Sequence, residues 1–308
     1  MTNAESGEER AAQGIPLIDP APRSMTLADG RRVTWQEFGA PGGRPALYFH
    51  GAGATSLEAG IFHREAVSHD VRLIAVNRPG AAGSSLCAGR RVADYSLDLV
   101  EVLDELQVDR FACFGESNGG MMTMAAAATM GARVLGAAPI NPTVPWFDPV
   151  ARSVSSSSAA IGYRFIKYLP RAVAALDASA AARRGTRKPS PAPPRQPHDR
   201  ADLEGPPPGI EKDVGEFQLR VMTERAGKHA LLAEMTWAST DWGFDPYSIP
   251  VPLDFFCGVH DAQAPFALIL TDRNPDARFH HFSFGHSGYA HPDARCRILE
   301  TVAGYFGS

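Results

Sequence analysis

The stretch Gly115-Glu116-Ser117-Asn118-Gly119 decides how the rest of the sequence is interpreted. It follows the apolar run Arg110-Phe111-Ala112-Cys113-Phe114, which predicts a short buried strand, and it precedes a methionine- and alanine-rich segment, which predicts a close-packed helix. A serine on a sharp turn between a strand and a helix stands clear of the sheet, and flanking glycines allow the cramped backbone. The stretch therefore predicts a turn that exposes Ser117. Because glycine and serine are common, the remaining segments must support this interpretation.

The composition favours a soluble globular protein with one large core, or a core and a small accessory domain. The chain has 308 residues, 44% of them hydrophobic, with 30 basic and 34 acidic side chains and a net charge of -4. This balance leaves no excess of positive charge that would attract nucleic acid or an anionic membrane, so we expect neither as a partner.

The chain start and the cysteines indicate a cytoplasmic protein. Residues 1–22 carry several charges and no continuous apolar run, so they predict a solvated extension instead of a secretory signal or membrane anchor. No later run approaches the length of a membrane span. The cysteines are widely scattered and lack the paired spacing of a metal site: Cys87, Cys113, Cys257 and Cys296. We expect reduced thiols and no metal.

Strands and helices alternate along much of the chain. The segment 24–38 predicts a hairpin around Asp29-Gly30. Predicted strands then follow at 46–49, 71–76, 134–140, 252–258 and 277–282, and predicted helices at 56–68, 94–107, after 264, and 292–306. In the helix at 94–107, Leu99, Val102 and Leu103 share one face, with the acidic residues turned away. The alternation predicts a mainly parallel sheet with helices on both faces.

The segment 143–249 interrupts this pattern and contains no clear strand. It is too long for an ordinary connection, so we interpret it as an inserted helical cap over the core formed by residues 23–142 and 250–308. Its predicted helices cover 151–182 and 214–237. Between them lies a segment at 183–209, rich in proline and arginine, for which we predict a disordered or irregular loop.

Five pieces of the chain occur in the order typical of one fold family. They are His50-Gly51, Arg78-Pro79-Gly80, Gly115-Glu116-Ser117-Asn118-Gly119, Gly258 with Asp261, and Gly285-His286. From about residue 25 to the end, the chain resembles the serine-nucleophile branch of the α/β-hydrolase fold with a helical cap. The resemblance implies a catalytic triad of Ser117, Asp261 and His286, in that order along the chain, and no cofactor.

Each implied role has a chemical reason. A serine hydroxyl is a poor nucleophile at neutral pH and needs a base, which the His286 imidazole supplies. A carboxylate, here Asp261, must hold the imidazole in the correct tautomer and stabilise the imidazolium. The resemblance also implies that the backbone N–H groups of Ala52 and Asn118 stabilise the oxyanion of the tetrahedral intermediate.

Other histidines and acids compete for these roles but occupy less suitable positions. The competing histidines lie in the predicted last strand or at a helix start: His280, His281 and His291. The competing acids lie in or before a predicted strand: Asp241, Asp245 and Asp254. Some members of the family carry the acid after the strand that precedes the cap. That position holds Asn141 here, which lacks the charge.

Several further residues are expected near the site. We interpret His50 as bracing its loop and Arg78 as fixing a turn. Glu116 is interpreted as a structural hydrogen-bond acceptor or, alternatively, as a charge that disfavours anionic substrates. The residues expected to border a substrate pocket are Gly53, Glu116, Trp146, Trp237 and Trp242. Asn77 replaces the aspartate common in the family, a change for which we expect only a local effect.

The sequence thus predicts an enzyme that cleaves a carboxylic ester or lactone of a small to medium apolar substrate through an acyl-enzyme. A serine nucleophile argues against dehalogenases and epoxide hydrolases, which use an aspartate. Carbon–carbon bond hydrolases, amidases or aminopeptidases, and acyltransferases remain alternatives because the same triad serves them. A non-covalent ligand-binding or ring-closing protein on the same scaffold is an alternative of another class. The oligomeric state stays open.

Overall fold

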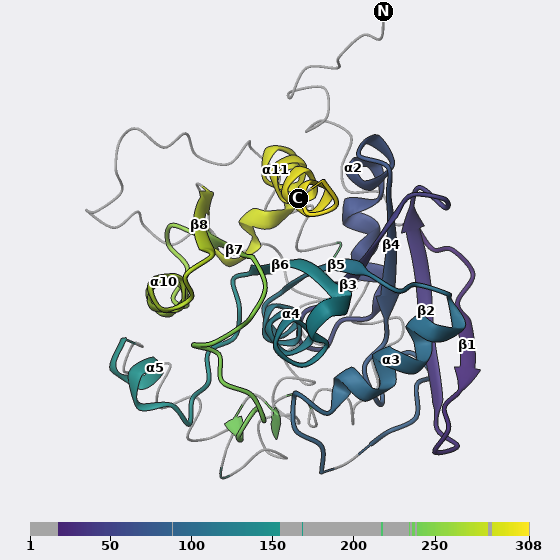
Figure 1. Cartoon of the computed structure of the whole chain (residues 1–308), viewed down its shortest axis with the longest axis horizontal. Coiled ribbons are helices and arrows are strands. Elements are labelled where there is room, and N and C mark those ends of the chain that lie inside the picture. The colour runs from purple at the N-terminus through teal and green to yellow at the C-terminus, as the bar shows by residue number, and fades with distance from the viewer. Residues whose placement is uncertain are drawn as a thin grey trace, which may run out of the picture.

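The computed structural model describes residues 18–87, 89–154, 239–282 and 285–307, together with Tyr168, Phe217, Glu234, Thr236 and Trp237. A single eight-stranded sheet runs through these residues in the order β1-β2-β4-β3-β5-β6-β7-β8 (Figure 1). The strands are β1 (Arg23–Thr26), β2 (Arg32–Gly39), β3 (Arg44–Phe49), β4 (Val71–Val76), β5 (Phe111–Glu116), β6 (Val134–Ile140), β7 (Leu253–Gly258) and β8 (Ala277–Phe282).

The sheet is antiparallel at one end and parallel elsewhere. Strand β2 pairs antiparallel with β1 and with β4, and all pairs from β4 to β8 are parallel. The predicted hairpin is present, since Met25 pairs with Val33 and the turn between the strands contains Gly30 at a φ of 82°. A positive φ of this kind is one that glycine adopts without steric cost. The mainly parallel sheet is therefore confirmed.

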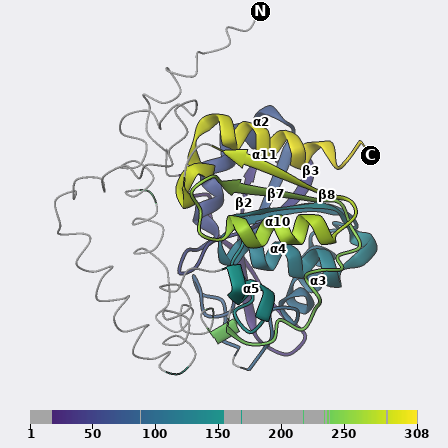
Figure 2. The ribbon, with the colours of Figure 1, turned by 90° about the vertical axis from the view of Figure 1, so that its left-hand side faces the viewer.

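Helices cover both faces of the sheet, as predicted (Figure 2). One face carries α3 (Tyr95–Glu105), α4 (Asn118–Thr129) and α10 (Ala264–Arg273), and the other carries α2 (His63–Ser68) and α11 (Pro292–Gly304). Alternate strand residues divide between the two layers: Leu47 and Phe49 join the first core cluster, and Ala46 and Tyr48 join the second. This alternation is what the period of two along a strand requires when both faces are buried.

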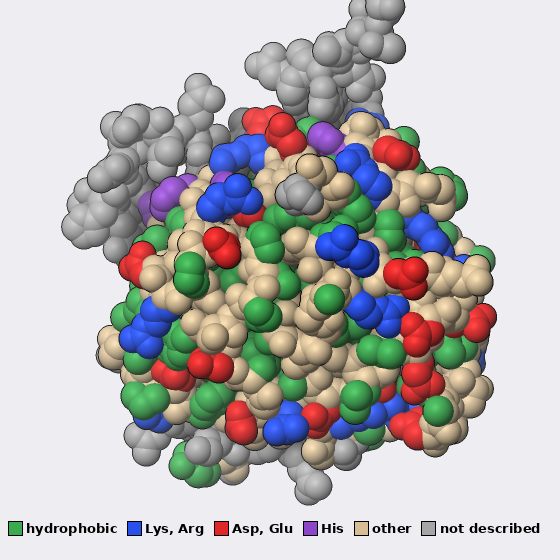
Figure 3. Space-filling model, in the orientation of Figure 1, with side chains coloured by type: hydrophobic (Ala, Val, Ile, Leu, Met, Phe, Trp, Pro, Cys, Tyr) green, Lys and Arg blue, Asp and Glu red, His purple; other side chains and the backbone are tan. Residues whose placement is uncertain are grey.

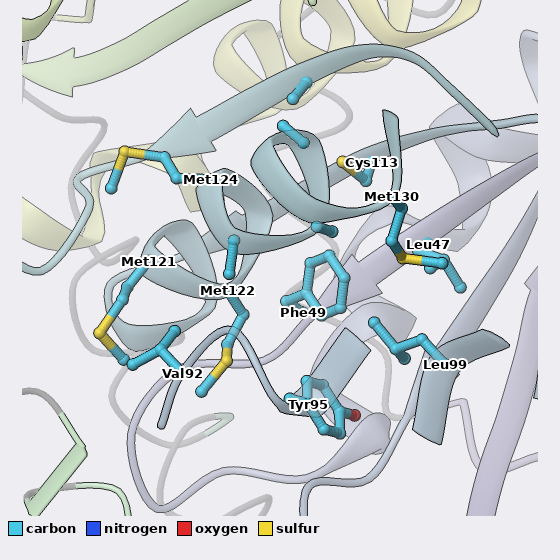
Figure 4. Close-up of a cluster of buried hydrophobic side chains, with 14 of the residues drawn as sticks. Leu47, Phe49, Val92, Tyr95, Leu99, Cys113, Met121, Met122, Met124 and Met130 are labelled. Atoms are coloured by element: carbon cyan, nitrogen blue, oxygen red, sulfur yellow. The ribbon is translucent and has the colours of Figure 1, made fainter. Parts of the chain in front are cut away.

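The first core cluster lies between the sheet and the methionine-rich helix α4. Met121 and Met122 reach toward Val92 and Tyr95, and Met130 lies beside Leu47 (Figure 4). All four cysteines are free, and Cys113 and Cys257 are buried, as expected for reduced core thiols. Flexible thioether side chains fill the irregular space between a helix and a sheet well.

Three details of the predicted helices are wrong. The segment predicted as one helix over 56–68 is a 3-10 helix, η1 (Ser56–Phe62), followed by α2. Asp98 of α3 is not turned to solvent, because it is buried and bonded to Arg31 and Arg90 at 2.5 Å and 2.6 Å. The last helix ends at Gly304 instead of 306. Hydrophobic spacing could not show the ion pairs of Asp98, because Arg31 and Arg90 both lie outside the helix.

Part of the predicted cap is described. The helix α5 (Pro149–Val154) corresponds to the start of the helix predicted from residue 151. The rest of that helix, most of the helix predicted over 214–237, the loop predicted at 183–209 and residues 1–17 of the predicted extension lie outside the described residues. The boundaries of the cap stay a prediction.

Charged side chains of both signs are interspersed over the face of the molecule seen in Figure 3. This distribution agrees with the nearly balanced composition. In the described part of the chain, no helix combines the length and the apolar character that crossing a membrane requires.

Candidate active site

Ser117 occupies the sharp turn between β5 and α4. Its backbone has φ 56° and ψ −115°, a region that residues other than glycine rarely adopt. The turn is held by hydrogen bonds from the Ser117 N–H to the Ile140 carbonyl at 2.9 Å and from the Thr143 N–H to the Ser117 carbonyl at 3.0 Å. The Ser117 side chain makes no capping hydrogen bond to α4, so its hydroxyl is not used as a helix cap.

The glycines of this turn are required by close packing. A Cβ on Gly119 would lie 1.9 Å from the Phe49 carbonyl oxygen, and one on Gly115 would lie 2.4 Å from the same atom. A Cβ on Gly120 would lie 2.8 Å from the Pro142 Cα. These contacts are too short for any larger residue, so the glycines let the turn and α4 approach the end of β3 and the chain after β6.

Asp261 and His286 are brought together by the loops that follow β7 and β8. The His286 Nδ1 lies 2.5 Å from the Asp261 Oδ2. The other carboxylate oxygen of Asp261 accepts the Gln263 N–H at 2.7 Å, and the Asp261 N–H donates to the Gly258 carbonyl at 3.0 Å. Asp261 is therefore fixed by its own turn and can orient the imidazole. His286 begins the 3-10 helix η3 (His286–Ala290).

Glu116, at the end of β5, contacts the other nitrogen of His286. Its Oε1 lies 2.8 Å from the His286 Nε2, and its side chain is 4% exposed. Within the described residues, Ser117 Oγ has no hydrogen bond to His286, so Nε2 faces Glu116 in this arrangement. The sequence predicted a hydrogen-bond acceptor at Glu116, but it gave no indication that the donor would be the proposed base.

The two carboxylates shift the titration of His286. Burial alone would lower the pKa of the imidazole, but the attraction of Glu116 and the hydrogen bonds to Asp261 and Glu116 outweigh it and raise the pKa to about 10. The His286 side chain is 41% exposed, so water screens part of this attraction. The competing histidines are engaged elsewhere or lie at a helix end: His280 Nε2 bonds Asp254 at 2.6 Å, and His291 caps α11.

Two buried residues on different segments brace the loop that follows β3. Arg78 donates to the His50 carbonyl at 2.5 Å and to the Gly51 carbonyl at 2.7 Å, which is the turn-fixing role expected for it. Its Nε also donates to Glu234 at 2.9 Å, and the second Glu234 oxygen accepts the Gly53 N–H at 2.9 Å. Glu234 comes from the predicted cap, so a buried ion pair connects that segment to the loop.

His50 lies in the same loop and is buried. Burial and the neighbouring Arg78 guanidinium hold the pKa of its imidazole well below the usual value. Its ring nitrogens lie 3.1 Å from the Gly51 carbonyl oxygen and 3.4 Å from the Arg78 N–H. These contacts agree with a bracing role. Within the described part of the chain, the N–H groups of Ala52 and Asn118 have no acceptor, which leaves both available.

Comparisons of the sequence with known proteins match only part of the chain. No protein-family model matches the sequence. A curated protein from Pseudomonas putida, the dihydrolipoyllysine-residue acetyltransferase component of an acetoin cleaving system, is 32% identical over 122 residues, which is 39% of this chain. The chain matches only 31% of that relative's length.

Solved structures match over most of the chain. An esterase from Exiguobacterium antarcticum superposes with a TM-score of 0.66 at 16% identity, covering 92% of this chain and 99% of that chain. An enol-lactonase from Burkholderia xenovorans gives 0.64 at 15% identity, covering 93% and 100%, and an epoxide hydrolase from Mycobacterium thermoresistibile gives 0.65 at 18%, covering 94% and 99%. The chain has the α/β-hydrolase fold.

Two residues that sequence reasoning did not assign to the site belong to it in this α/β-hydrolase fold. Asn141, at a φ of 41°, donates from Nδ2 to the His286 carbonyl at 2.7 Å and accepts the Gly258 N–H at 3.0 Å. It was considered only as a possible acid and rejected for lacking charge. Asparagine tolerates a positive φ better than most residues, and its amide both donates and accepts, which this position uses.

Glu58 of η1 is the second residue that the sequence did not indicate. Its Oε2 accepts the Gly51 N–H at 2.6 Å and the Tyr48 hydroxyl at 2.9 Å. Burial and the neighbouring Glu116 raise the pKa of this carboxyl to about 8. A glutamate within the apolar run of η1 was the available signal, because such a side chain must find partners when it is buried.

The aromatic residues expected to border a pocket are largely buried. Trp146, Trp237 and Trp242 belong to the same core cluster as α4. Trp242 is fully buried, with its ring 5.7 Å from that of Phe244 and 6.0 Å from that of Phe147. These three tryptophans therefore pack against the core of the α/β-hydrolase fold. Their contact with a substrate stays a prediction.

Proposed function

We propose that the protein is a serine hydrolase that cleaves a carboxylic ester or lactone through an acyl-enzyme. The observation that carries the proposal is the strained turn at Ser117, whose hydroxyl is not used as a helix cap. The preceding residue, Glu116, contacts His286, and His286 in turn contacts Asp261. Backbone strain of this kind costs free energy and persists where the surrounding structure enforces it, often at functional sites.

In the proposed reaction, Ser117 Oγ attacks the carbonyl carbon while His286 Nε2 accepts the hydroxyl proton. The tetrahedral intermediate places its oxyanion against the N–H groups of Ala52 and Asn118. His286 then gives the proton to the leaving alcohol, and the carbon–oxygen bond of the ester breaks. Water repeats the sequence on the acyl-enzyme and releases the acid. Asp261 stays ionised and stabilises the imidazolium in both halves.

The Arg78 and Glu234 pair supports this assignment of the oxyanion donors. Both residues are buried, and together they hold the carbonyls of His50 and Gly51 and the N–H of Gly53. Donors that are fixed before the reaction stabilise a developing charge without reorganisation. The residues on both sides of Ala52 are held in this way, Gly51 through its carbonyl and Gly53 through its N–H.

A panel of substrates tests the proposal. We expect turnover of short acyl esters or lactones, and we expect Ser117→Ala to lower kcat by about 1,000-fold or more while the protein stays folded. The panel includes amides and carbon–carbon bond substrates, which the same triad could process. Activity of Ser117→Ala close to that of the unchanged protein would overturn the assignment of the nucleophile.

Acyl transfer to an acceptor other than water is the second candidate. The observation that favours it is the 32% identity over 122 residues to the acetyltransferase component of an acetoin cleaving system. An acyl-enzyme on Ser117 can react with any alcohol or thiol that reaches it, so adding such acceptors to the panel separates the two functions. Transfer is supported if the acylated acceptor accumulates faster than the free acid.

A further inference from the structure

The imidazole of His286 lies between two carboxylates. Asp261 Oδ2 is 2.5 Å from Nδ1, and Glu116 Oε1 is 2.8 Å from Nε2. A neutral imidazole has one N–H and one lone pair, so it can donate to only one of these groups. Both contacts are hydrogen bonds to ionised carboxylates only when His286 is an imidazolium. In this form its Nε2 has no lone pair with which to accept the Ser117 proton.

A second buried carboxyl group reaches the same place as Glu116. An atom at the position of a Gly51 Cβ would lie 2.4 Å from Glu116 Oε2 and 3.4 Å from Glu58 Oε1. Both glutamates are 3% exposed. Two carboxyl groups this near to each other in a buried site are not both ionised readily, because like charges repel strongly where water is excluded. Position 51 also has no room for a side chain.

Burial and the neighbouring Glu116 favour the protonated form of Glu58 and outweigh the donors Tyr48 and Gly51, which favour the ionised form. The Tyr48 hydroxyl and the Gly51 N–H both donate to Glu58 Oε2, which leaves Oε1 to carry a proton. The nearby cation Arg78 is already paired with Glu234. The titratable or charged groups that face this cluster are Tyr48 on β3, Glu58 on η1, His50 and Arg78 in the loops after β3 and β4, Asp261 after β7, and His286 and Tyr289 on η3.

We propose that Glu116 is a positioning residue that competes with Ser117 for His286 Nε2, and that Glu58 is its protonated partner. This inference rests on the proposed serine-hydrolase function. The resting site holds a protonated Glu58, an ionised Glu116 and an imidazolium at His286. To become a base, His286 releases its Nε2 proton to water, which frees the Nε2 lone pair for Ser117. The pair thereby sets the pH above which the reaction begins.

The charges in the cluster agree with this proton arrangement. The pKa of His286 is raised to about 10 by Glu116 and Asp261 against the effect of burial, and the pKa of Glu58 is raised to about 8 by burial and by Glu116. At pH 7 both groups then carry their protons.

The test measures the protonation of His286 directly and through the reaction. Long-range ¹H–¹⁵N NMR reports whether both imidazole nitrogens carry protons, and kcat/KM against pH reports the base form. We expect an imidazolium at pH 7.5 in the unchanged protein. In Glu116→Gln, which keeps an acceptor for Nε2 but removes the charge, we expect both the imidazole titration and the rising limb of kcat/KM to move down by about one pH unit or more.

Two further variants make the result specific. Glu58→Gln keeps an acceptor for Tyr48 and Gly51 and removes only the ionisation, so it should move the His286 titration in the same direction by a smaller amount. Glu101→Gln removes one negative charge from a different part of the chain, where Glu101 accepts the Ala28 N–H, and should leave the titration unchanged. Equal shifts in Glu101→Gln and Glu116→Gln would overturn the proposal.

A neutral imidazole at pH 7.5 in the unchanged protein would also overturn the inference, whether or not any variant folds. Failure of the proposed function gives a different pattern. If no acyl substrate is turned over but Glu116→Gln lowers the His286 titration, the contact between the two residues is established and the hydrolase assignment fails. If esters are cleaved and the titration does not move, the hydrolase assignment stands and the role of Glu116 fails.

Discussion

At the residue scale, His286 takes its position from three neighbours, of which Glu116 ends β5 and Asp261 and Asn141 lie in loops. Asp261 holds Nδ1, Glu116 holds Nε2, and Asn141 holds the backbone carbonyl. A side chain that is 41% exposed would otherwise sample several rotamers. The three contacts restrict it, so each of them can be tested separately from the nucleophile.

We predict that Asp261→Asn lowers kcat for ester hydrolysis by about 1,000- to 10,000-fold, because an amide cannot stabilise the imidazolium or fix its tautomer. Its matched control is Asp254→Asn, which changes another buried aspartate that also contacts a histidine, His280, at 2.6 Å. The control should lose stability but keep the kcat of the folded protein. A larger loss of kcat in Asp254→Asn than in Asp261→Asn would show that the wrong acid has been assigned.

The sequence predicted which residues lie at this site, but it did not predict all of the contacts between them. The order of motifs named Asp261 and His286, and their side chains lie 2.5 Å apart. The contact between Glu116 and His286 was not predicted. The direction of a side chain at the end of a strand depends on the loops that meet there, and hydrophobic periodicity carries no information about those loops.

At the element scale, the loops after β3 and β4 are held together by buried polar contacts. Arg78, after β4, bonds carbonyls of the loop after β3, and Glu234, in the predicted cap, bonds both Arg78 and that loop. A buried ion pair is costly to break, because removal of one partner leaves an uncompensated charge away from water. The pair therefore links the stability of this loop to Glu234.

We predict that Glu234→Gln lowers the free energy of unfolding by about 3–5 kcal/mol. The same change should lower kcat because the loop that carries Ala52 loses a contact. Urea denaturation and ester hydrolysis measure the two effects. The control is Asp104→Asn, which breaks an ion pair with Arg133 in which the aspartate is 62% exposed, and it should cost less than about 1 kcal/mol. Similar losses in the two variants would contradict the role of Glu234.

Three strands were predicted most closely. The strands at 71–76, 134–140 and 277–282 have the predicted bounds. The segment 56–68 was predicted less well, since its first half is a 3-10 helix in which Ser56 and Glu58 bond other segments: the Ser56 N–H donates to Asn77, and Glu58 accepts from Tyr48. Long-range polar contacts of this kind override local preference and cannot be derived from a helical pattern.

At the scale of the whole molecule, the proton cluster affects how stability depends on pH. Glu58 and His286 both have a pKa that is higher in the folded protein, at about 8 and about 10, than the ordinary value of each group. A raised pKa means that the folded state keeps a proton that the unfolded chain releases. Stability is therefore lost as pH rises, from about 4.3 to 8 for Glu58 and from about 6.5 to 10 for His286.

We predict that the free energy of unfolding is lower at pH 9 than at pH 5.5, and that Glu58→Gln reduces this difference. Glutamine has no ionisation to suppress, and it keeps an acceptor for Tyr48 and Gly51. Urea denaturation at the two pH values measures the effect, and Glu101→Gln serves as the control for net charge. Unchanged or greater alkaline sensitivity in Glu58→Gln would contradict the assignment of a protonated Glu58.

The central claim is that Ser117 is the nucleophile, and covalent labelling tests it most directly. The protein is treated with a fluorophosphonate, and its intact mass and peptides are measured by mass spectrometry. The account predicts a single adduct on the peptide that contains Ser117, absent in Ser117→Ala and formed more slowly in His286→Gln. No adduct under conditions that label a known serine esterase, or an adduct on a different residue, would contradict it.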